Sequence, residues 1–264
     1  MRPSPEALQL LRPDWPAPPG VQAACSLRLG GMSAGPYESL NLGDHVGDDP
    51  EAVAANRARY AQALGARPVY MKQVHGWQVA RLAADTPDGI EADACVATGP
   101  GLACTIMVAD CLPVLLASGD GRVVAAAHAG WRGLAGQGGR GVLESVWEAF
   151  WPLAGPTREV SAAGTLAWLG PCIGPTAFEV GPEVKAAFEV HDAGAGALFR
   201  AHGPGKWLAD LPGLARRRLH ALGIDRVFGN DGSTAWCTVS DPSRFFSHRR
   251  DRVSGRLAAS VWIG

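Results

Sequence analysis

The chain has 264 residues, 47% apolar and 19% charged, which is typical of a globular protein with a well-buried core and not of a disordered chain. The formal net charge is −1 and the longest basic run is Arg216, Arg217 and Arg218, which argues against a nucleic-acid partner. The N-terminal segment MRPSPEALQLLRPDWPAPPG contains neither a signal-peptide core nor a membrane span, so we expect a cytoplasmic protein without membrane contacts.

Strand-like and helix-like segments alternate along the chain. In chain order, the pattern predicts a strand at 21–29, a helix at 50–65, strands at 68–83, 101–110, 111–117 and 122–130, a helix at 141–154, a strand at 165–170, and helices at 182–191 and 208–223. The helix at 50–65 has Pro50 near its start and Gly65 at its end, the usual asymmetry of helix termini. No repeat or polar linker divides the chain, so we predict one α+β domain over 1–264, with about the first 20 residues as a loose arm.

The six cysteines are spread through the chain without a CxxC pair. Thiols of cytoplasmic proteins normally stay reduced, so no disulfide framework is expected. Cys25, Cys95 and Cys104 lie in apolar surroundings, where a thiol behaves as a small hydrophobic group. Cys172, in GPCIGP, is favoured as a buried structural thiol over a residue that approaches the active site.

The segment CLPVLLASGDGRVVAAAH (111–128) is typical of a β-hairpin, because the turn residues Gly-Asp-Gly separate two apolar runs. A loop centred on Gly119 and Asp120 would place Cys111 directly opposite His128, on one face of the ladder. Opposed β-carbons lie about 4.5–5.5 Å apart, from which a thiolate and an imidazole can reach a common metal ion. Pro113 lacks a ladder donor and could shift this register by one residue.

A third candidate ligand is His75 in MKQVHGW, where Gly76 allows close approach of the backbone. Spacing alone does not bring it to the hairpin. Two nitrogens and one sulfur match a catalytic zinc site, which keeps a fourth position open. A single His or Cys is more often structural than a ligand, so composition alone favours a structural role for each of the three residues.

Several strings together resemble one family, the YfiH-type laccase-domain proteins. The strings are NLGDHVGDD (41–49), NR (56–57), KQVHG (72–76), ADCLPVLLA (109–117), HAGWRG (128–133), GPCIGPTAFEVG (170–181) and CT…FFSHRRD…SGR (237–256). They follow one another over most of the chain, and ADCLPV with HAGWRG is a specific combination. The resemblance implies an α/β/β/α sandwich and a zinc site made by His75, Cys111 and His128.

The resemblance also implies a function, since similar proteins are purine nucleoside phosphorylases acting on adenosine, inosine, guanosine and methylthioadenosine, with adenosine deaminase activity. The expected partners are therefore purine nucleosides and phosphate; no feature of the sequence specifies an oligomeric state. Family members were first named polyphenol oxidases or multicopper laccases. A laccase needs several copper centres and His-x-His pairs, whereas this chain has seven histidines and no such pair, so zinc is favoured over copper.

Other residues are candidates for substrate contacts. After His128 the sequence AGWRGLAGQGGRG predicts a glycine-rich turn that opens into a helix, whose amides could bind phosphate beside Arg132. The alternative is that the glycines permit tight packing and that Arg132 is a solvated surface residue. The strings that resemble the family also contain five candidates for contacts with ribose, base or phosphate, or alternatively for turn caps and ion pairs: Asn41, Arg57, Gln73, Asp110 and Arg249.

Two other readings remain open at the level of sequence. Cys111 opposite His128 also has the geometry of an activated thiol, related folds include deamidating toxins, and some family members are linked to editing of peptidoglycan precursors, which together suggest a hydrolase. A non-catalytic, metal-stabilised binding module is the third class of answer. The open fourth position of a three-ligand site argues against it.

Overall fold

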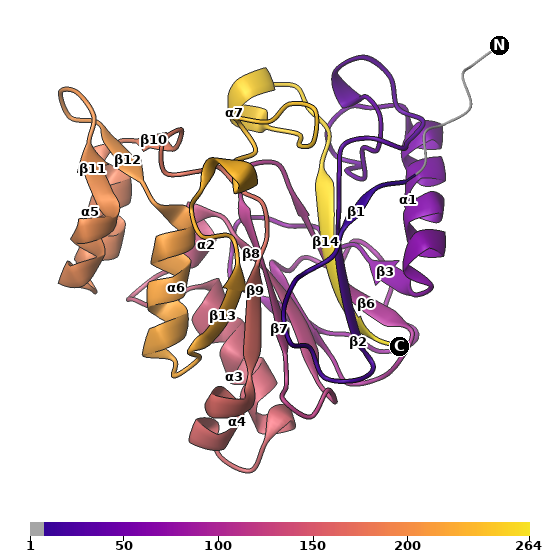
Figure 1. Ribbon diagram of the computed structural model, residues 1–264, viewed down its shortest axis with the longest axis horizontal. Helices are drawn as coiled ribbons and strands as arrows, with labels where there is room; N and C mark the ends of the chain where they lie inside the picture. Colours follow the sequence, from indigo (N-terminus) through magenta and orange to yellow (C-terminus); the bar gives the residue numbers. More distant parts are fainter. Residues whose placement is uncertain (1–7) are drawn as a thin grey trace.

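The computed structural model describes residues 8–264. Two β-sheets pack face to face, and helices cover the outer face of each (Figure 1). The first sheet has the strand order β1 (Leu10–Leu11), β2 (Val21–Ser26), β14 (Leu257–Ile263), β6 (Leu102–Val108) and β3 (Arg67–Val69). The second has the order β13 (Arg226–Gly229), β9 (Leu166–Leu169), β7 (Leu112–Ala117), β8 (Val124–Ala129), β5 (Ala94–Ala97) and β4 (Val79–Arg81).

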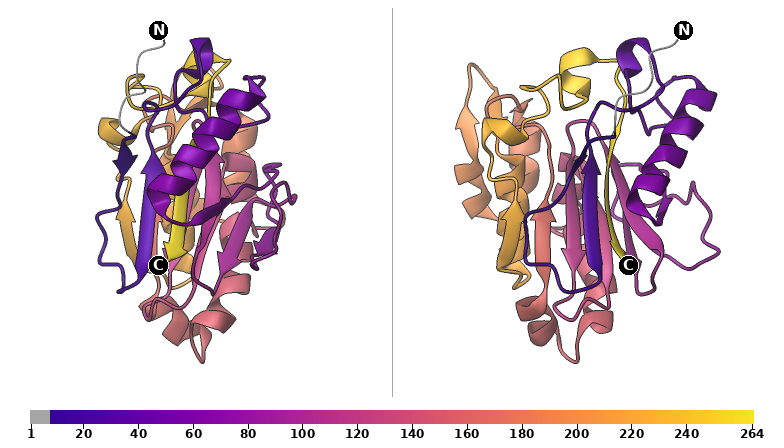
Figure 2. Two further views of the ribbon diagram at one scale, coloured as in Figure 1. Left: turned by 90° about the vertical axis from the view of Figure 1, so that its right-hand side faces the viewer. Right: turned by 45° about the vertical axis from the view of Figure 1, so that its right-hand side comes forward.

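Helix α1 (Pro50–Leu64) lies across the outer face of the first sheet (Figure 2). The outer face of the second sheet is covered by helices that include α3 (Val142–Ala154) and α6 (Leu211–Ala221), whereas α5 (Pro182–Glu189) lies farther out, against β10 and β12 of the small sheet. The remaining elements are α2 (Trp131–Ala135), α4 (Arg158–Gly164), α7 (His248–Asp251), three 3-10 helices at Gly35–Tyr37, Ala193–Leu198 and Thr234–Trp236, and a small sheet of β10 (Glu179–Val180), β12 (Trp207–Ala209) and β11 (Phe199–Ala201).

Alternation along the central strands produces these layers, because successive side chains of a strand point to opposite faces. In β14, Leu257 and Ala259 enter the core between the two sheets, whereas Ala258 and Trp262 enter the core beneath α1. Both faces of each sheet are thus apolar, which explains the nearly continuous apolar runs of the sequence. The α/β/β/α order predicted from the family resemblance is confirmed.

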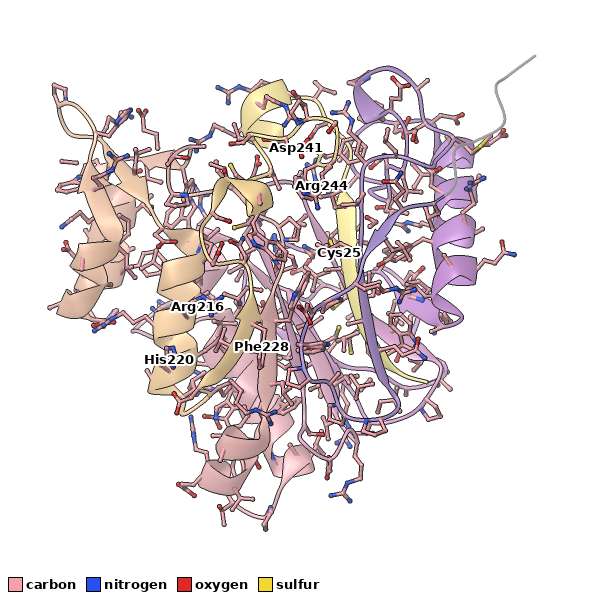
Figure 3. The ribbon with its side chains drawn as sticks, in the orientation of Figure 1. Cys25, Arg216, His220, Phe228, Asp241 and Arg244 are labelled. Atoms are coloured by element: carbon pink, nitrogen blue, oxygen red, sulfur yellow. The ribbon has the colours of Figure 1, made fainter. Side chains whose placement is uncertain are left out.

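One arginine of helix α6 forms hydrogen bonds with the edge strand of the second sheet and the residue that follows it. Arg216 donates hydrogen bonds to the carbonyl oxygens of Val227 (2.9 Å) and Asn230 (2.8 Å), and Figure 3 shows it beside Phe228 of β13. The guanidinium therefore satisfies backbone acceptors that no neighbouring strand pairs. Arg216, one of the three consecutive arginines at 216–218, therefore has a structural role.

The helices predicted at 50–65, 141–154 and 182–191 are confirmed by α1, α3 and α5. The segment 208–223 begins differently: Trp207–Ala209 is a strand, and α6 starts only after Asp210, whose carboxylate accepts a hydrogen bond from the Gly213 amide. The strand predicted at 68–83 is wrong as a single element. It divides into β3 and β4, which belong to different sheets, because the intervening chain crosses from one sheet to the other.

Residues 8–20 pack against the domain and do not form the loose arm that we expected over about the first 20 residues. Leu10 and Leu11 pair with β2, and Trp15 packs against the core between the sheets. Residues 1–7 lie outside the described residues. Over residues 8–264, no helix combines the length and the hydrophobicity that a membrane crossing requires.

The register of the β7–β8 hairpin differs from the predicted one by two residues. Pro113, not Cys111, lies opposite His128, and Ala117 pairs with Val124. The loop is centred on Asp120 and Gly121, because the Asp120 carboxylate accepts hydrogen bonds from the Ser118 hydroxyl and the Arg122 amide, while Gly121 adopts φ 73°. An even shift preserves the face of every side chain, so Cys111 and His128 still point to the same side.

Candidate metal centre

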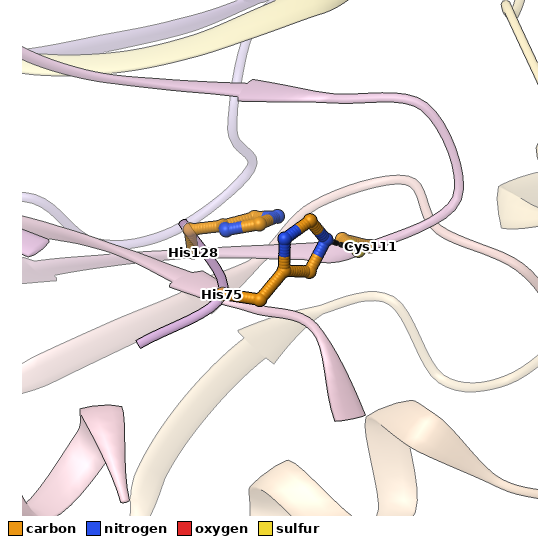
Figure 4. A group of neighbouring side chains, drawn as sticks. All are labelled: His75, Cys111 and His128. Carbon is orange, nitrogen blue, oxygen red and sulfur yellow. Dashed lines mark hydrogen bonds between the residues drawn. The ribbon is translucent and has the colours of Figure 1, made fainter. Parts of the chain in front are cut away.

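The ligand atoms of His75, Cys111 and His128 all lie within 4.8 Å of one another (Figure 4). The Cys111 Sγ atom is 3.8 Å from Nε2 of His75. The two imidazole rings meet edge to face, with centroids 4.8 Å apart and an angle of 68° between their planes. The structure therefore brings together the three residues predicted from the sequence as metal ligands.

The group sits at one end of the space between the two sheets. His128 is on the same face of β8 as Val124 and Ala126, which belong to the core between the sheets. Cys111 directly precedes β7 and packs against the same core. At the start of β7 and the end of β8, the side chains that face this core are therefore the Cys111 thiol and the His128 imidazole, and not apolar groups.

His75 lies on the connection that crosses from β3 in the first sheet to β4 in the second. It adopts φ 61°, an uncommon conformation for a residue with a side chain. The connection is held at both sides of His75. The Gln73 side chain exchanges two hydrogen bonds of 2.8 Å with the backbone of Met107, and the Asp93 carboxylate accepts hydrogen bonds from the amides of Val74, His75 and Gly76.

The same carboxylate also holds His128. Oδ1 of Asp93 lies 2.8 Å from Nδ1 of His128, and the aspartate side chain is fully buried. Burial raises the pKa of Asp93, but the hydrogen bonds and charge of His128 and the nearby amides outweigh it and lower this pKa below its usual value. Asp93 therefore remains a carboxylate, and Nε2 is the ring nitrogen of His128 left for a ligand role.

Cys111 and His128 shift each other's protonation. Burial raises the pKa of the Cys111 thiol, yet the neighbouring His128 and His75 outweigh burial and lower it to about 6. Burial lowers the pKa of His128, while the Cys111 thiolate and the Asp93 carboxylate outweigh burial and raise it to about 9. In the absence of metal the pair is thus a thiolate and an imidazolium at neutral pH.

Two glycines make room for this group. A Cβ atom at Gly130 would lie 2.9 Å from the Cys111 Sγ atom and 3.0 Å from Cδ2 of His75. A Cβ atom at Gly133 would lie 2.7 Å from the carbonyl oxygen of Gly76. The glycines of HAGWRG therefore permit close packing of α2 against the connection that carries His75.

The donor set and the spacing fit a tetrahedral zinc ion. Zinc–sulfur and zinc–nitrogen bonds of about 2.3 and 2.0–2.1 Å place tetrahedral ligands roughly 3.4–3.6 Å apart. The observed Sγ to Nε2 distance is 3.8 Å, and no pair of ligand atoms exceeds 4.8 Å. A thiolate is already favoured at Cys111, so only small side-chain movements separate the described geometry from a three-ligand site.

A cavity of about 440 Å³ opens onto the three residues. Its other lining residues include seven apolar or aromatic ones, Met107, Val108, Ala109, Trp131, Ile173, Phe178 and Leu211, and six basic ones, His45, Arg132, His248, Arg249, Arg252 and Arg256. One carboxylate, Asp110, lines it. Its oxygens accept hydrogen bonds of 2.6 Å from the Thr238 hydroxyl and the Arg249 amide.

Comparison with known proteins identifies the family of the chain. A family model described as multi-copper polyphenol oxidoreductase laccase matches residues 22–264. The chain belongs to this family. The match to the laccase family confirms the resemblance noted in the sequence.

Individual members of the laccase family are similar over nearly the whole chain. The chain is 46% identical over 257 residues to a protein of Escherichia coli K12 named purine nucleoside phosphorylase YfiH, covering 97% of this chain and 99% of that one. It is 48% identical over 254 residues to a purine nucleoside phosphorylase of Pseudomonas aeruginosa, covering 96% and 98%.

Solved structures of the laccase family agree with the fold. A Neisseria meningitidis protein superimposes with a TM-score of 0.87 at 44% identity, covering 96% of this chain and 98% of that one. YlmD from Geobacillus stearothermophilus superimposes with a TM-score of 0.83 at 30% identity, covering 98% and 97%. The mixed α and β single-domain fold is therefore shared within the laccase family.

The residues expected to contact substrate fall into two groups. Arg132, Arg249, Asp110 and Gln73 line the cavity. Arg132 stacks on Trp131, with 4.4 Å from the guanidinium carbon to the ring centroid. Arg249 donates a hydrogen bond of 3.0 Å to the Glu179 carbonyl oxygen and lies over the Phe178 ring, and its position is fixed by β10.

Asn41 and Arg57 lie behind the cavity wall. The Asn41 side chain is fully buried and bonds to Gly43, Asp48 and the Arg256 amide. Arg57 donates to the Leu42 carbonyl oxygen, pairs with Asp44 at 3.2 Å and stacks on Tyr70. In this structure, both side chains hold the segment that carries His45.

Five polar residues at the site were not singled out from the sequence: Asp93, His45, His248, Arg252 and Arg256. The four basic ones lie within or beside the family-like strings, at segments that only the fold brings to the cavity. Asp93 carried a weaker signal, an acidic residue directly before the fully buried strand β5. A buried carboxylate at such a position requires hydrogen-bond donors nearby.

Proposed function

We propose that the protein is a zinc-dependent purine nucleoside phosphorylase that acts on adenosine, inosine, guanosine and methylthioadenosine, with phosphate as the second substrate. The observation that carries this proposal is one cavity that joins the His75, Cys111 and His128 group to an excess of basic side chains. Its volume of about 440 Å³ falls within the range of roughly 300–1,000 Å³ typical of small-molecule sites. The names of the relatives support the same reaction.

The basic side chains suit a phosphate dianion. Among the described residues, the guanidinium groups of Arg132, Arg249, Arg252 and Arg256 form no ion pair with a carboxylate. Arg256 donates two hydrogen bonds through one nitrogen, to the carbonyl oxygens of Ser254 and Gly255, which orient the guanidinium. An unpaired, oriented arginine in a cavity is a strong binding group for an anion.

The apolar side chains suit the purine. Trp131, Ile173, Phe178 and Leu211 come from elements that pack on the second sheet, whereas His45 and Arg256 come from segments beside the first sheet. We call the side formed by these four apolar residues the apolar wall and the side formed by His45 and Arg256 the basic wall. Arg132 and Arg249 lie on the apolar side, against the rings of Trp131 and Phe178. We assign the purine to the apolar wall and the phosphate to the basic wall, with the ribose between them.

The reaction joins a phosphate oxygen to C1′ of the ribose as the bond from C1′ to the purine nitrogen breaks. The purine leaves with the electron pair of that bond and takes up a proton. The basic wall would hold the phosphate in line with C1′ and so remove much of the entropic barrier. Zinc, when bound by His75, Cys111 and His128, would supply a Lewis acid with an open position.

Backbone strain supports a functional role for this cavity. Among residues 8–264, the three non-glycine residues with positive φ are His75, Asp110 and Arg252, at 61°, 91° and 63°. All three line the cavity. Such conformations cost free energy and cluster at functional sites.

The test is incubation of the zinc-loaded protein with each of the four nucleosides, with and without phosphate. Phosphorolysis requires ribose 1-phosphate, or its methylthio analogue, together with the free base, and only when phosphate is present. Adenosine deaminase activity, which we propose for the same site, would instead give inosine and ammonia without phosphate. The phosphorylase proposal fails if no phosphate-dependent base is released from any nucleoside.

A cysteine or zinc hydrolase that edits peptidoglycan precursors is the second candidate. The observation that favours it is the lowered pKa of Cys111, to about 6, beside His128, since a thiolate next to an imidazolium is a nucleophile. Activity lost to a chelator and restored by zinc rules out a free cysteine nucleophile. Release of free base from a nucleoside only when phosphate is present argues against a hydrolase of either kind. The polyphenol oxidase reading of the family name needs several copper sites, and residues 8–264 contain one group of three close ligands.

A further inference from the structure

Asp93 connects the two histidines of the candidate zinc site, although they come from different parts of the chain. Its Oδ1 atom lies 2.8 Å from His128 Nδ1 and accepts a hydrogen bond of 2.9 Å from the His75 amide. Its Oδ2 atom accepts hydrogen bonds from the amides of Gly76 at 2.7 Å and Val74 at 3.1 Å. One carboxylate thus fixes a ring on β8 and the backbone that carries the other ring.

The surroundings of Asp93 exclude direct contact with a substrate. The residue has no exposed surface, so it cannot contact substrate in the cavity. Its four donors use up the acceptor positions of both oxygens. The Asp93 amide donates a hydrogen bond to the Gln78 carbonyl oxygen, and the Asp93 carbonyl oxygen accepts one of 2.7 Å from the His128 amide. The backbone of Asp93 therefore binds the same two segments as its side chain, namely strand β8 and the connection that carries His75.

We propose that Asp93 is the positioning residue of the zinc site, a role that rests on the proposed function. It selects the tautomer of His128 in which Nδ1 carries the proton and Nε2 faces His75 and Cys111. It also holds His75 in its positive-φ conformation by binding three consecutive amides. Carboxylates that orient histidine ligands in this way typically contribute about 10- to 100-fold to metal affinity.

Charge supports the same role. The Cys111 thiolate and the Asp93 carboxylate together carry two negative charges, which balance a divalent cation held by two neutral imidazoles. Asp93 and His128 are buried, so water screens the charge of Asp93 only weakly, and removal of that charge should disfavour a divalent ion in particular. Asparagine at this position would also direct its NH₂ group at backbone or ring donors, because it keeps only one acceptor oxygen.

The decisive measurement is zinc affinity of the metal-free protein by competition with a chelating dye, for the wild type, Asp93→Asn and Asp88→Asn. Asp88 is the matched control, since its Oδ1 accepts a hydrogen bond of 2.9 Å from the Tyr70 amide on the same connection. We expect the zinc dissociation constant to rise about 10- to 100-fold for Asp93→Asn and to stay within about twofold of wild type for Asp88→Asn. Equal affinity of Asp93→Asn and wild type overturns the proposal.

Thermal unfolding separates positioning from a merely structural role. A structural role lowers the melting temperature of metal-free Asp93→Asn and leaves its zinc affinity unchanged, which would overturn the proposal. A positioning role reduces the additional stabilisation that zinc gives. If the wild type itself binds no zinc, the zinc part of the proposed function fails as well. If the wild type binds zinc and Asp93→Asn binds it equally well, only the positioning role of Asp93 is refuted.

A measurement on the wild type keeps the proposal testable if Asp93→Asn does not fold. Nitrogen-15 spectra of histidine in the zinc-loaded protein report which ring nitrogen carries the proton. We expect the Nδ1-protonated tautomer at His128, with its proton in a hydrogen bond to a carboxylate. The opposite tautomer would show that Asp93 does not orient this ring.

Discussion

Gly130 lies so close to Cys111 that a methyl group on its Cα atom would be 2.9 Å from the Sγ atom. The backbone of Gly130, at φ −65° and ψ 154°, is accessible to any residue. Crowding at the thiol, and not backbone strain, therefore requires glycine at this position.

Gly130→Ala should consequently act on the metal site without disturbing the backbone. We expect zinc affinity to fall at least about tenfold, because ligand geometry tolerates displacements of only about 0.5 Å, and overpacking to cost about 1–3 kcal/mol of stability in the metal-free protein. Gly99→Ala is the control, since a Cβ atom there meets no atom within 4 Å and its φ is not positive. Unchanged zinc binding in Gly130→Ala would show that the thiol is not a ligand in this position.

Cys111 should be the reactive thiol of the metal-free protein. The other five cysteines are buried, whereas Cys111 is partly exposed. Because its pKa is lowered from the ordinary 9.0 to about 6, alkylation by iodoacetamide should reach its plateau above pH 7 and fall by half near pH 6. Peptide mapping after timed alkylation measures this profile.

Two controls accompany the alkylation profile. His128→Ala removes the neighbouring imidazolium and should move the midpoint upward, toward that of an ordinary thiol. Zinc should protect Cys111 from alkylation if the thiolate is a ligand. A midpoint near pH 9 in the wild type would contradict the thiolate and imidazolium pair.

The layered fold could be predicted because its signals are local. Pro50 and Gly65 mark the ends of α1, and the apolar runs of β6, β7 and β8 match strands that are buried on both faces. The hairpin register was wrong although its signal was present. Asp-Gly is among the dipeptides favoured at the centre of a hairpin loop, and centring the loop on Asp120-Gly121 gives the observed pairing.

The metal group could be predicted only in part, because long-range contacts assemble it. Cys111 and His128 share one hairpin, so strand alternation places them on one face. His75 is held near them by contacts of its own segment with Asp93, which lies 18 residues after His75, and with Met107, which lies 34 residues after Gln73. Neither contact has a local signature, and only the family resemblance indicated that His75 joins the site.

Among the cavity arginines, Arg256 should be the one whose substitution weakens phosphate binding most selectively. It lines the cavity, forms no ion pair with a carboxylate of the described residues and is oriented by the carbonyl oxygens of Ser254 and Gly255. A charge-assisted hydrogen bond is worth about 1.5–3 kcal/mol, so Arg256→Gln should raise the KM for phosphate about 10- to 100-fold and change the KM for inosine much less.

Initial rates over a phosphate titration measure the effect of Arg256→Gln. Arg158→Gln is a suitable control, because Arg158 pairs with Glu148 and does not line the cavity. Arg256→Lys should recover part of the phosphate affinity, since it restores the charge without the planar fork. A parallel rise in both KM values would instead indicate a general collapse of the cavity.

Gln73 should stabilise the protein by extending a sheet with its side chain. Strand β3 pairs with β6 only as far as Val69 and Cys104, and further along β6 the Gln73 amide group exchanges two hydrogen bonds with the backbone of Met107. The side chain thus takes the place of the missing strand. Gln73→Met fills a similar volume but leaves the amide and carbonyl of Met107 without these partners.

Unsatisfied buried backbone groups cost about 1–3 kcal/mol each, so denaturant unfolding of metal-free Gln73→Met should show a loss of at least about 1 kcal/mol. Gln62→Met, on the exposed face of α1, should change stability by less than about 0.5 kcal/mol. Because the Gln73 contact lies two residues before His75, zinc affinity should also fall in Gln73→Met. A stable variant with unaltered zinc binding would mean that Asp93 alone is sufficient to hold the connection in place.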